Sequence, residues 1–240
     1  MHYSVLLIPI VVPVLFWACY HQYKDRHLPE PAGHLLIAFL FGVAAFYLGL
    51  LMYRGLDIVG LRYDAYTLAE TNPAGLFAYA VLAIGVIEEL AKLIPFLLFV
   101  IRFKEFDEPI DGIIYASFIA LGFATVENVR FLQYLSGAEA LARGFAGPVV
   151  HIVFASIWGY YVGRAFLCGR SVAPPVLGAL AFTAFLHGSY DFLVIAMPPP
   201  VLPLAALLIL GIWVWRLRLI RDLHNLPAGP CPENEDASGI

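Results

Sequence analysis

Charged side chains lie inside long hydrophobic runs of this chain, where such runs normally carry none. They are Glu88, Glu89, Lys92, Glu127 and Asp191, and two histidines, His151 and His187, lie in similar surroundings. A carboxylate or ammonium in a transmembrane helix costs about 2.5–3.5 kcal/mol even on the mildest scale. We therefore expect these side chains to face one another inside a helical bundle rather than lipid. Carboxylates grouped with imidazoles are the groups of metal binding and acid–base chemistry.

The composition of the chain is that of a membrane protein. Of its 240 residues, 61% are hydrophobic and only 13% are charged, and the mean hydropathy of +0.82 is far above that of a soluble domain. The net charge of -4 is too small to indicate a nucleic-acid partner. The expected partners are the lipid bilayer and a protein that shares it.

Seven stretches are long and apolar enough to span about 30 Å of hydrocarbon. They cover residues 3–20, 34–53, 75–101, 110–133, 146–166, 173–196 and 200–217. We predict an all-α fold, a polytopic membrane bundle of about seven transmembrane helices that takes up residues 1–226. Residues 54–74 are expected to hold a short interfacial helix, and the polar segment 227–240 is expected to be a disordered cytoplasmic tail.

The distribution of Lys and Arg among the loops predicts the orientation, because cytoplasmic loops carry an excess of both. With the N-terminus outside, nine such residues are cytoplasmic: Lys24, Arg26, Arg102, Lys104, Arg164, Arg170, Arg216, Arg218 and Arg221. Four are on the outer side: Arg54, Arg62, Arg130 and Arg143. The bias predicts a multi-pass protein of a prokaryotic cytoplasmic membrane with its N-terminus outside and its C-terminus in the cytoplasm.

The third stretch carries an acidic pair followed by a lysine. Glu88 and Lys92 are four residues apart and share a helix face, whereas Glu89 points about 100° away. Pro95 is expected to bend the helix just past the pair. An ion pair between Glu88 and Lys92 that only neutralises itself would leave Glu89 without a partner, so we favour a functional interpretation.

The next two stretches each contribute a candidate ligand. Glu127 is a strong acceptor, and Asn128 beside it can fix a carboxylate or a substrate amide. Glu127 alone could instead reach the membrane interface from a helix end. His151 follows Gly147 and Pro148, and alone it could be a hydrogen-bonded core residue.

The sixth stretch carries His187 and Asp191, which share a helix face at a spacing of four residues. They are either two ligands or a histidine oriented by its carboxylate, and a purely structural pair is the alternative. Ionisable residues of this kind occur on four successive predicted helices. Together they are much stronger evidence for a functional site than any one of them alone.

These residues resemble the ordered motifs of the PrsW-type intramembrane proteases. The matching motifs are Glu88-Glu89-x-x-Lys92, Phe123-x-x-x-Glu127-Asn128, His151 and His187-x-x-x-Asp191, with Glu108-Pro109-Ile110-Asp111-Gly112-Ile113 before the fourth stretch. The resemblance covers about residues 75–195. The wider superfamily includes the CAAX prenyl proteases, which carry a histidine where this chain has Glu127. The resemblance implies a zinc-type metalloprotease that acts within the membrane on a single-pass protein such as an anti-sigma factor.

The chemistry of peptide hydrolysis assigns roles to the same residues. A metal ion with two or three N/O ligands and an open position activates water near neutral pH. Glu127, His151 and His187 form such a set, and Asp191 is a fourth ligand or a partner of His187.

The acidic pair and two polar residues complete the expected active site. Glu88 or Glu89 is the expected base. Lys92 and Asn128 are expected to neutralise the acidic cluster or to bind the oxyanion.

Counting residues from the expected helix ends places most of the site in the outer half of the bilayer. Glu127, His151, His187 and Asp191 fall there, and the acidic pair falls near the middle. We therefore expect cleavage near the extracytoplasmic boundary of the substrate. Two other classes remain open: a non-catalytic scaffold or sensor that binds a partner helix at this site, and a proton-coupled transporter.

Overall fold

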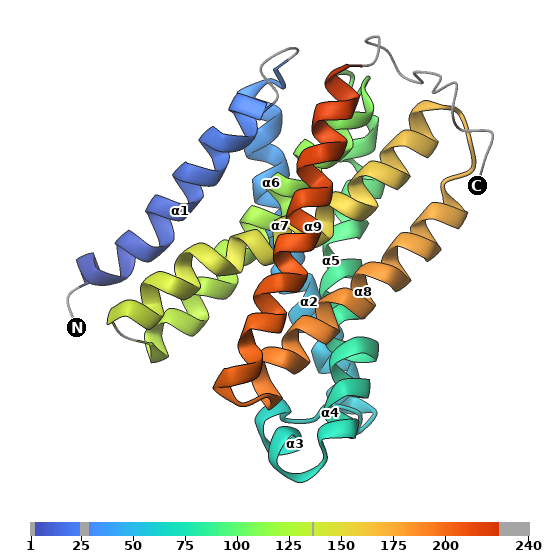
Figure 1. The fold of residues 1–240 in the computed structure, drawn as a ribbon. Coiled ribbons are helices and arrows are strands. Elements are labelled where there is room, and N and C mark those ends of the chain that lie inside the picture. The colour runs from blue at the N-terminus through green and yellow to red at the C-terminus, as the bar shows by residue number, and fades with distance from the viewer. Residues whose placement is uncertain (1–2, 25–28, 136, 226–240) are drawn as a thin grey trace.

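The computed structural model of the chain describes residues 3–24, 29–135 and 137–225, and every regular element within them is helical (Figure 1). The elements are α1 (Tyr3–Lys24), α2 (Ala32–Ile58), α3 (Ala65–Thr71), α4 (Pro73–Tyr79), η1 (Ala80–Gly85), α5 (Val86–Leu98), η2 (Val100–Arg102), α6 (Pro109–Phe131), η3 (Leu132–Tyr134), α7 (Gly137–Leu167), α8 (Ala173–Ala196), η4 (Pro199–Val201) and α9 (Leu202–His224). The predicted all-α fold is confirmed for this part of the chain. The tail expected over 227–240 lies outside the described residues.

Five helices are long and apolar enough to cross a membrane: α2, α6, α7, α8 and α9. The other two expected spans fall on α1 and on the uninterrupted helical stretch α4–η1–α5 from Pro73 to Leu98. The protein is therefore a multi-pass membrane protein. Figure 1 shows α3 and α4 at one end of the bundle, near the C-terminal end of α2 and the N-terminal end of α9.

Helix α6 is the centre of the bundle. Its most apolar window is 89% buried, against 33% for α2 and 17% for α9, and it packs against α2 on one side and α7 on the other. Its N-terminus is a capping box, in which Glu108 caps a backbone N–H and the Asp111 carboxylate accepts the Glu108 N–H at 2.7 Å. The motif that begins at Glu108 thus starts the central helix.

Glycine contacts bring the site-bearing helices unusually close. A Cβ on Gly85 would lie 2.3 Å from the carbonyl oxygen of Ala184, and one on Gly188 would lie 2.5 Å from the backbone of Ala80. Gly112 and Gly159 form the same kind of contact between α6 and α7. Because van der Waals packing drives helix association in lipid, small residues at such crossings favour the assembled bundle.

Helix α7 differs from its predicted bounds, because it begins at Gly137 rather than near residue 146. Pro148 suggests a helix start but lies inside the helix, where it cannot donate to the carbonyl of Gly144. The Asn128 Nδ2 of α6 donates to that carbonyl instead, at 3.4 Å. A tertiary hydrogen bond therefore lets the helix continue through the proline.

The segment between α2 and α4 contains the expected short helix, α3. Asp64 caps it, since its carboxylate accepts the Thr67 backbone N–H at 2.8 Å. Asn72 caps α4 in the same way through the Gly75 N–H at 2.9 Å. Both caps are local signals that the sequence alone displays.

Arg216 corrects the predicted orientation count, because it is not a loop residue. Helix α9 continues to His224, and the Arg216 side chain is fully buried among α6, α7 and α9. Without Arg216, eight Lys and Arg residues remain on the predicted cytoplasmic side, against four on the predicted outer side.

Candidate metal centre

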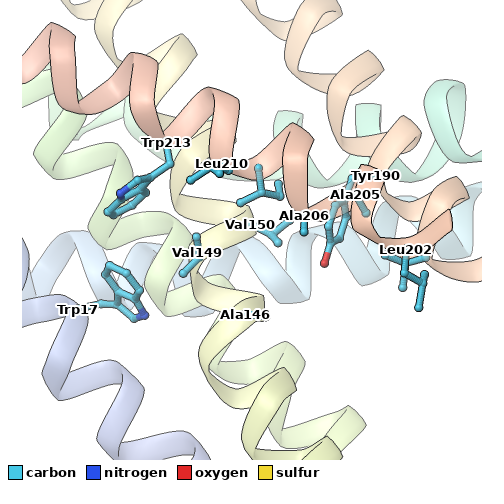
Figure 2. Close-up of a pocket in the computed structure, with 12 residues that line it drawn as sticks. Trp17, Ala146, Val149, Val150, Tyr190, Leu202, Ala205, Ala206, Leu210 and Trp213 are labelled. Atoms are coloured by element: carbon cyan, nitrogen blue, oxygen red, sulfur yellow. The ribbon is translucent and has the colours of Figure 1, made fainter. Parts of the chain in front are cut away.

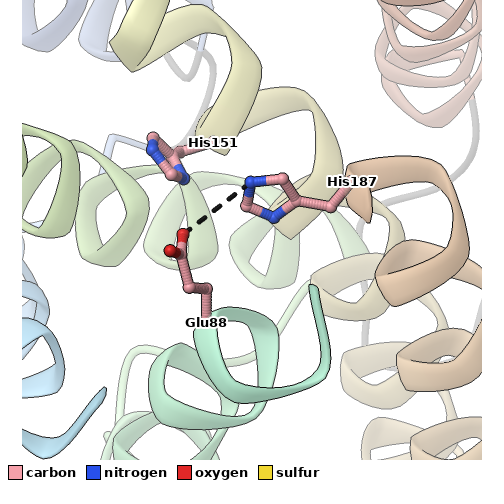
Figure 3. A group of neighbouring side chains, drawn as sticks. All are labelled: Glu88, His151 and His187. Atoms are coloured by element: carbon pink, nitrogen blue, oxygen red, sulfur yellow. Dashed lines mark ion pairs between the residues drawn. The ribbon is translucent and has the colours of Figure 1, made fainter. Parts of the chain in front are cut away.

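Three side chains from three helices meet inside the bundle (Figure 3). Glu88 of α5, His151 of α7 and His187 of α8 each offer one ligand atom, and these atoms lie within 4.8 Å of one another. The π-helical turn η1 ends just before α5, and such turns often lie at functional sites because they change which face of the helix carries each side chain.

The histidine of α8 is held by a carboxylate on one ring nitrogen. His187 Nδ1 lies 2.7 Å from Glu89 Oε1, whereas its Nε2 lies 3.8 Å from both Glu88 Oε2 and Asp191 Oδ2. A carboxylate on one imidazole nitrogen orients the ring and makes the other nitrogen a better ligand. His187 Nε2 therefore faces the centre of the cluster.

Glu89 has partners on both of its oxygens. Its side chain is fully buried, and besides His187 it accepts from Lys92 Nζ at 2.6 Å and from Trp158 Nε1 at 2.9 Å. Lys92 therefore pairs with Glu89. The alternative from the sequence was an ion pair between Lys92 and Glu88 that only neutralised its own charges. A buried ion pair needs such extra hydrogen bonds to offset desolvation.

His151 connects the cluster to the other predicted ligand. Its Nε2 lies 2.9 Å from Glu127 Oε2, and its Nδ1 lies 3.3 Å from Lys92 Nζ. Glu127 also pairs with Arg143 at 3.1 Å. Glu127 is therefore part of the buried site and does not extend to the interface from its helix end.

His151 lies deeper along its helix than the outer half of the bilayer, where the sequence placed it. It lies fourteen residues after the start of α7 at Gly137, or about 21 Å along the helix. Glu88 lies fifteen residues after Pro73, a similar distance along α4–η1–α5. The earlier start of α7 explains how the acidic pair and this histidine can meet.

Three residues of the site were not predicted from the sequence: Tyr53, Trp158 and Arg143. The Tyr53 hydroxyl of α2 lies 3.3 Å from Glu88 Oε1, and no pattern in its apolar surroundings marks it. Trp158 lies seven residues after His151, a spacing that shares a helix face and could have been noticed. Arg143 was counted only as a loop charge.

The residues present fit a divalent cation. One carboxylate and two imidazoles within ligand distance are a donor set of catalytic zinc sites. The cluster holds four carboxylates, Glu88, Glu89, Glu127 and Asp191, against the two cations Lys92 and Arg143. If all are ionised, two negative charges remain, which is the charge that a divalent ion balances.

Comparison with known proteins agrees with this chemistry. A family model described as PrsW family intramembrane metalloprotease matches residues 30–216. The chain is 33% identical to "Protease PrsW" of Geobacillus kaustophilus (strain HTA426), over 78% of each chain. It is 29% identical to "Protease PrsW" of Bacillus subtilis (strain 168), over 78% of this chain and 81% of the relative, and 30% identical to that of Clostridioides difficile (strain 630), over 78% of each. No solved structure matches the chain.

Together with these relatives, the polytopic helical bundle and its buried carboxylate–imidazole centre identify a membrane-embedded metallopeptidase, which is a hydrolase. With a family match over residues 30–216, the chain belongs to the PrsW family of intramembrane metalloproteases.

Proposed function

We propose that this protein uses zinc to hydrolyse a peptide bond in a single-pass membrane protein of the anti-sigma-factor type, near the substrate's extracytoplasmic boundary. The observation that carries the proposal is the convergence of Glu88, His151 and His187 inside the bundle. Two imidazoles and a carboxylate within ligand distance are what metal-assisted hydrolysis requires, which is why we favour the peptidase over the scaffold.

In this proposal His151 and His187 hold the metal, and Glu127, which lies 2.9 Å from His151, supplies the carboxylate ligand, with Asp191 beside His187. Glu88 lies within 4.8 Å of both imidazoles as well, and it is kept off the ion so that it can act on the water. When bound, the ion would supply Lewis acidity, lowering the pKa of water and polarising the scissile carbonyl. Glu88 is the base, because its carboxylate lies close to both imidazoles, and with Tyr53 on Oε1 its other oxygen, Oε2, faces His187 Nε2 at 3.8 Å. It takes the proton from water and returns it to the leaving amine.

The other residues position these groups. Glu89 has both oxygens occupied by Lys92, Trp158 and His187, so it orients His187 rather than moving protons. Lys92 neutralises the cluster. Asn128, predicted to neutralise the acidic cluster or to bind the oxyanion, instead donates to the Gly144 carbonyl and supports α7 in this proposal.

We further propose that α1 and α4–η1–α5 also cross the membrane, which makes seven spans with the N-terminus outside. The loop charges favour this orientation. Glu127 and Asp191 lie four and five residues before the ends of α6 and α8 that would face outward, whereas His151 and Glu88 lie about 21 Å along their helices from the outward-facing starts. The proposed site therefore extends from the middle of the bilayer toward the outer boundary, where cleavage is expected. The bundle over 1–226 is then one unit, with 227–240 as its cytoplasmic tail.

The test compares Glu88→Gln and Glu89→Gln in purified full-length protein. Glu88→Gln is expected to lower cleavage of a single-pass reporter by at least about 100-fold, with bound zinc and melting temperature close to those of the unaltered protein. Glu89→Gln is expected to lower the melting temperature, because it leaves Lys92 buried without its counter-charge. Glu139→Gln, an exposed change at the start of α7, is the matched control.

Two results would overturn the proposal. Full cleavage by Glu88→Gln would exclude Glu88 as the base. Active protein that contains no metal would favour a mechanism in which a glutamate and a histidine activate water without an ion, and protein that binds zinc but cleaves no reporter would favour the scaffold.

A further inference from the structure

An apolar groove of about 610 Å³ lies between α1, α7, α8 and α9 (Figure 2). Its walls include Trp17, Val149, Ile209, Leu210 and Trp213. Val150 and Tyr190 also line it, and each directly precedes a residue of the site, His151 or Asp191. Since consecutive helix residues point about 100° apart, α7 and α8 present one face to the groove and a different face to the site.

One end of the groove is aromatic and electropositive. Figure 2 shows Trp17 of α1 and Trp213 of α9 facing each other there, with ring centroids 5.4 Å apart. Tyr20, one helical turn further along α1, lies 5.6 Å from Trp213. Lys24 Nζ lies 5.8 Å from the Tyr20 ring, and the Arg216 guanidinium lies 5.4 Å from the Trp213 ring.

Arg216 is a fully buried cation with the Tyr20 hydroxyl as a neutral neighbour, and no carboxylate pairs with it among the described residues. Its Nε and Nη2 donate to the hydroxyls of Ser156 and Ser117 at 2.8 and 3.1 Å. Both hydroxyls donate in turn to carbonyls of their own helices, so they supply oxygen but no negative charge. An uncompensated buried charge strongly favours an anionic partner.

Unsatisfied polar atoms gather at the same end. Within the described part of the chain, Trp17 Nε1 is a buried donor without a hydrogen-bond partner, and Arg216 Nη1 has none apart from the neighbouring Tyr20 hydroxyl. Trp17 itself lines the groove. Because buried polar groups are rarely left unpaired, this end lacks a ligand rich in acceptor oxygens.

We propose that the groove binds one anionic glycerophospholipid. An acyl chain fills the apolar groove, and the ester and phosphate oxygens meet Trp17, Tyr20 and Lys24, with Arg216 behind them. The volume lies in the range of small-ligand sites, whereas a whole substrate helix is about 10–12 Å across. Aromatic residues mark membrane interfaces, and basic pockets between transmembrane helices bind anionic headgroups.

The test measures lipid retention by the purified full-length protein with native mass spectrometry. Dioleoyl phosphatidylglycerol is titrated against dioleoyl phosphatidylcholine, which has the same chains and no net charge. One phosphatidylglycerol should be retained at a concentration about tenfold lower. Lys24→Gln should reduce this preference about fivefold, whereas Arg218→Gln, an equal charge loss at an exposed position of α9, should leave it unchanged.

A second variant tests the groove itself without changing charge. Ala206→Trp places a large side chain in the groove and should abolish retention of both lipids. Inorganic phosphate should not compete if the acyl chain contributes to binding. Equal retention of the two lipids, competition by phosphate alone, or displacement only by a single-pass substrate peptide would each overturn the proposal.

Discussion

At the scale of single residues, the site is organised by which carboxylate already has partners. Adjacent glutamates on one helix point in different directions, so α5 presents Glu89 to Lys92 and Trp158 and Glu88 to Tyr53 and His187. Two chemically identical side chains therefore acquire different roles from their contacts. Glu89 is a buried anion that is fully hydrogen-bonded, and Glu88 remains available for proton transfer.

Trp158→Phe tests this division of roles. It removes the indole N–H from Glu89 Oε2, and an unsatisfied buried acceptor costs about 1–3 kcal/mol. The melting temperature in detergent should fall, and zinc affinity should fall with it because His187 loses part of its support. Trp215→Phe on α9 is the control, and equal effects from the two substitutions would argue against a specific role for the Glu89 contact.

At the scale of elements, the helices depend on tertiary contacts at their weak points. Pro148 interrupts the hydrogen bonding of α7, and a side chain from α6 replaces the missing donor. Gly85 and Gly188 allow η1 and α8 to approach each other beside Glu88 and His187. Both features act near the metal centre, so errors in packing there would move its ligands.

Asn128→Ala should lower the free energy of unfolding by about 1–3 kcal/mol, because it leaves the Gly144 carbonyl without a donor. Pro148→Ala restores a backbone N–H that can reach that carbonyl. The double variant should therefore regain most of the lost stability in denaturant titrations of the protein in mixed micelles. If Pro148→Ala gives no recovery, Asn128 acts through something other than this carbonyl.

Gly188→Ala should disrupt the contact between α8 and η1, since the new Cβ would lie 2.5 Å from the Ala80 backbone. We expect a loss of about 1–3 kcal/mol from overpacking, together with weaker zinc binding. Gly178→Ala on the same helix is the matched control, because nothing lies within 4 Å of its Cβ position. Calorimetric melting of both variants in detergent measures the difference, and similar melting temperatures would show that the backbones can separate without cost.

At the scale of the whole molecule, the metal centre joins helices that are far apart in sequence. Residues of α5, α6, α7 and α8 meet there around an excess of negative charge. A cation that binds this arrangement and not the unfolded chain stabilises the fold by mass action.

Removing the metal should therefore destabilise the bundle as well as abolish cleavage. Treatment with a chelator is expected to lower the melting temperature, and added zinc should restore it, with about 2.7 kcal/mol of stabilisation at a free zinc concentration 100 times its dissociation constant. His187→Ala should melt at the same temperature with and without chelator. A chelator effect that persists in this variant would place the ion elsewhere.

The sequence by itself determined the class of fold and most members of the site. Long apolar runs require helices in lipid, where each backbone group must be satisfied within its own segment. The cost of lone charges in those runs is enough to single out Glu88, Glu89 and Lys92 as residues that need partners inside the bundle. The bounds of α8 and the short helix α3 also followed, because caps and apolar lengths are local signals.

Only the tertiary structure decided which of these groups touch. The pairing of Lys92 with Glu89, the start of α7 at Gly137 and the burial of Arg216 all depend on neighbouring helices. Tyr53 became a site residue only because α2 packs on α5. The periodicity of a sequence shows which residues share a helix face. Which helix packs against that face depends on how closely the two backbones can approach. At Gly85 and Gly188 this distance is set by the packing of the whole bundle.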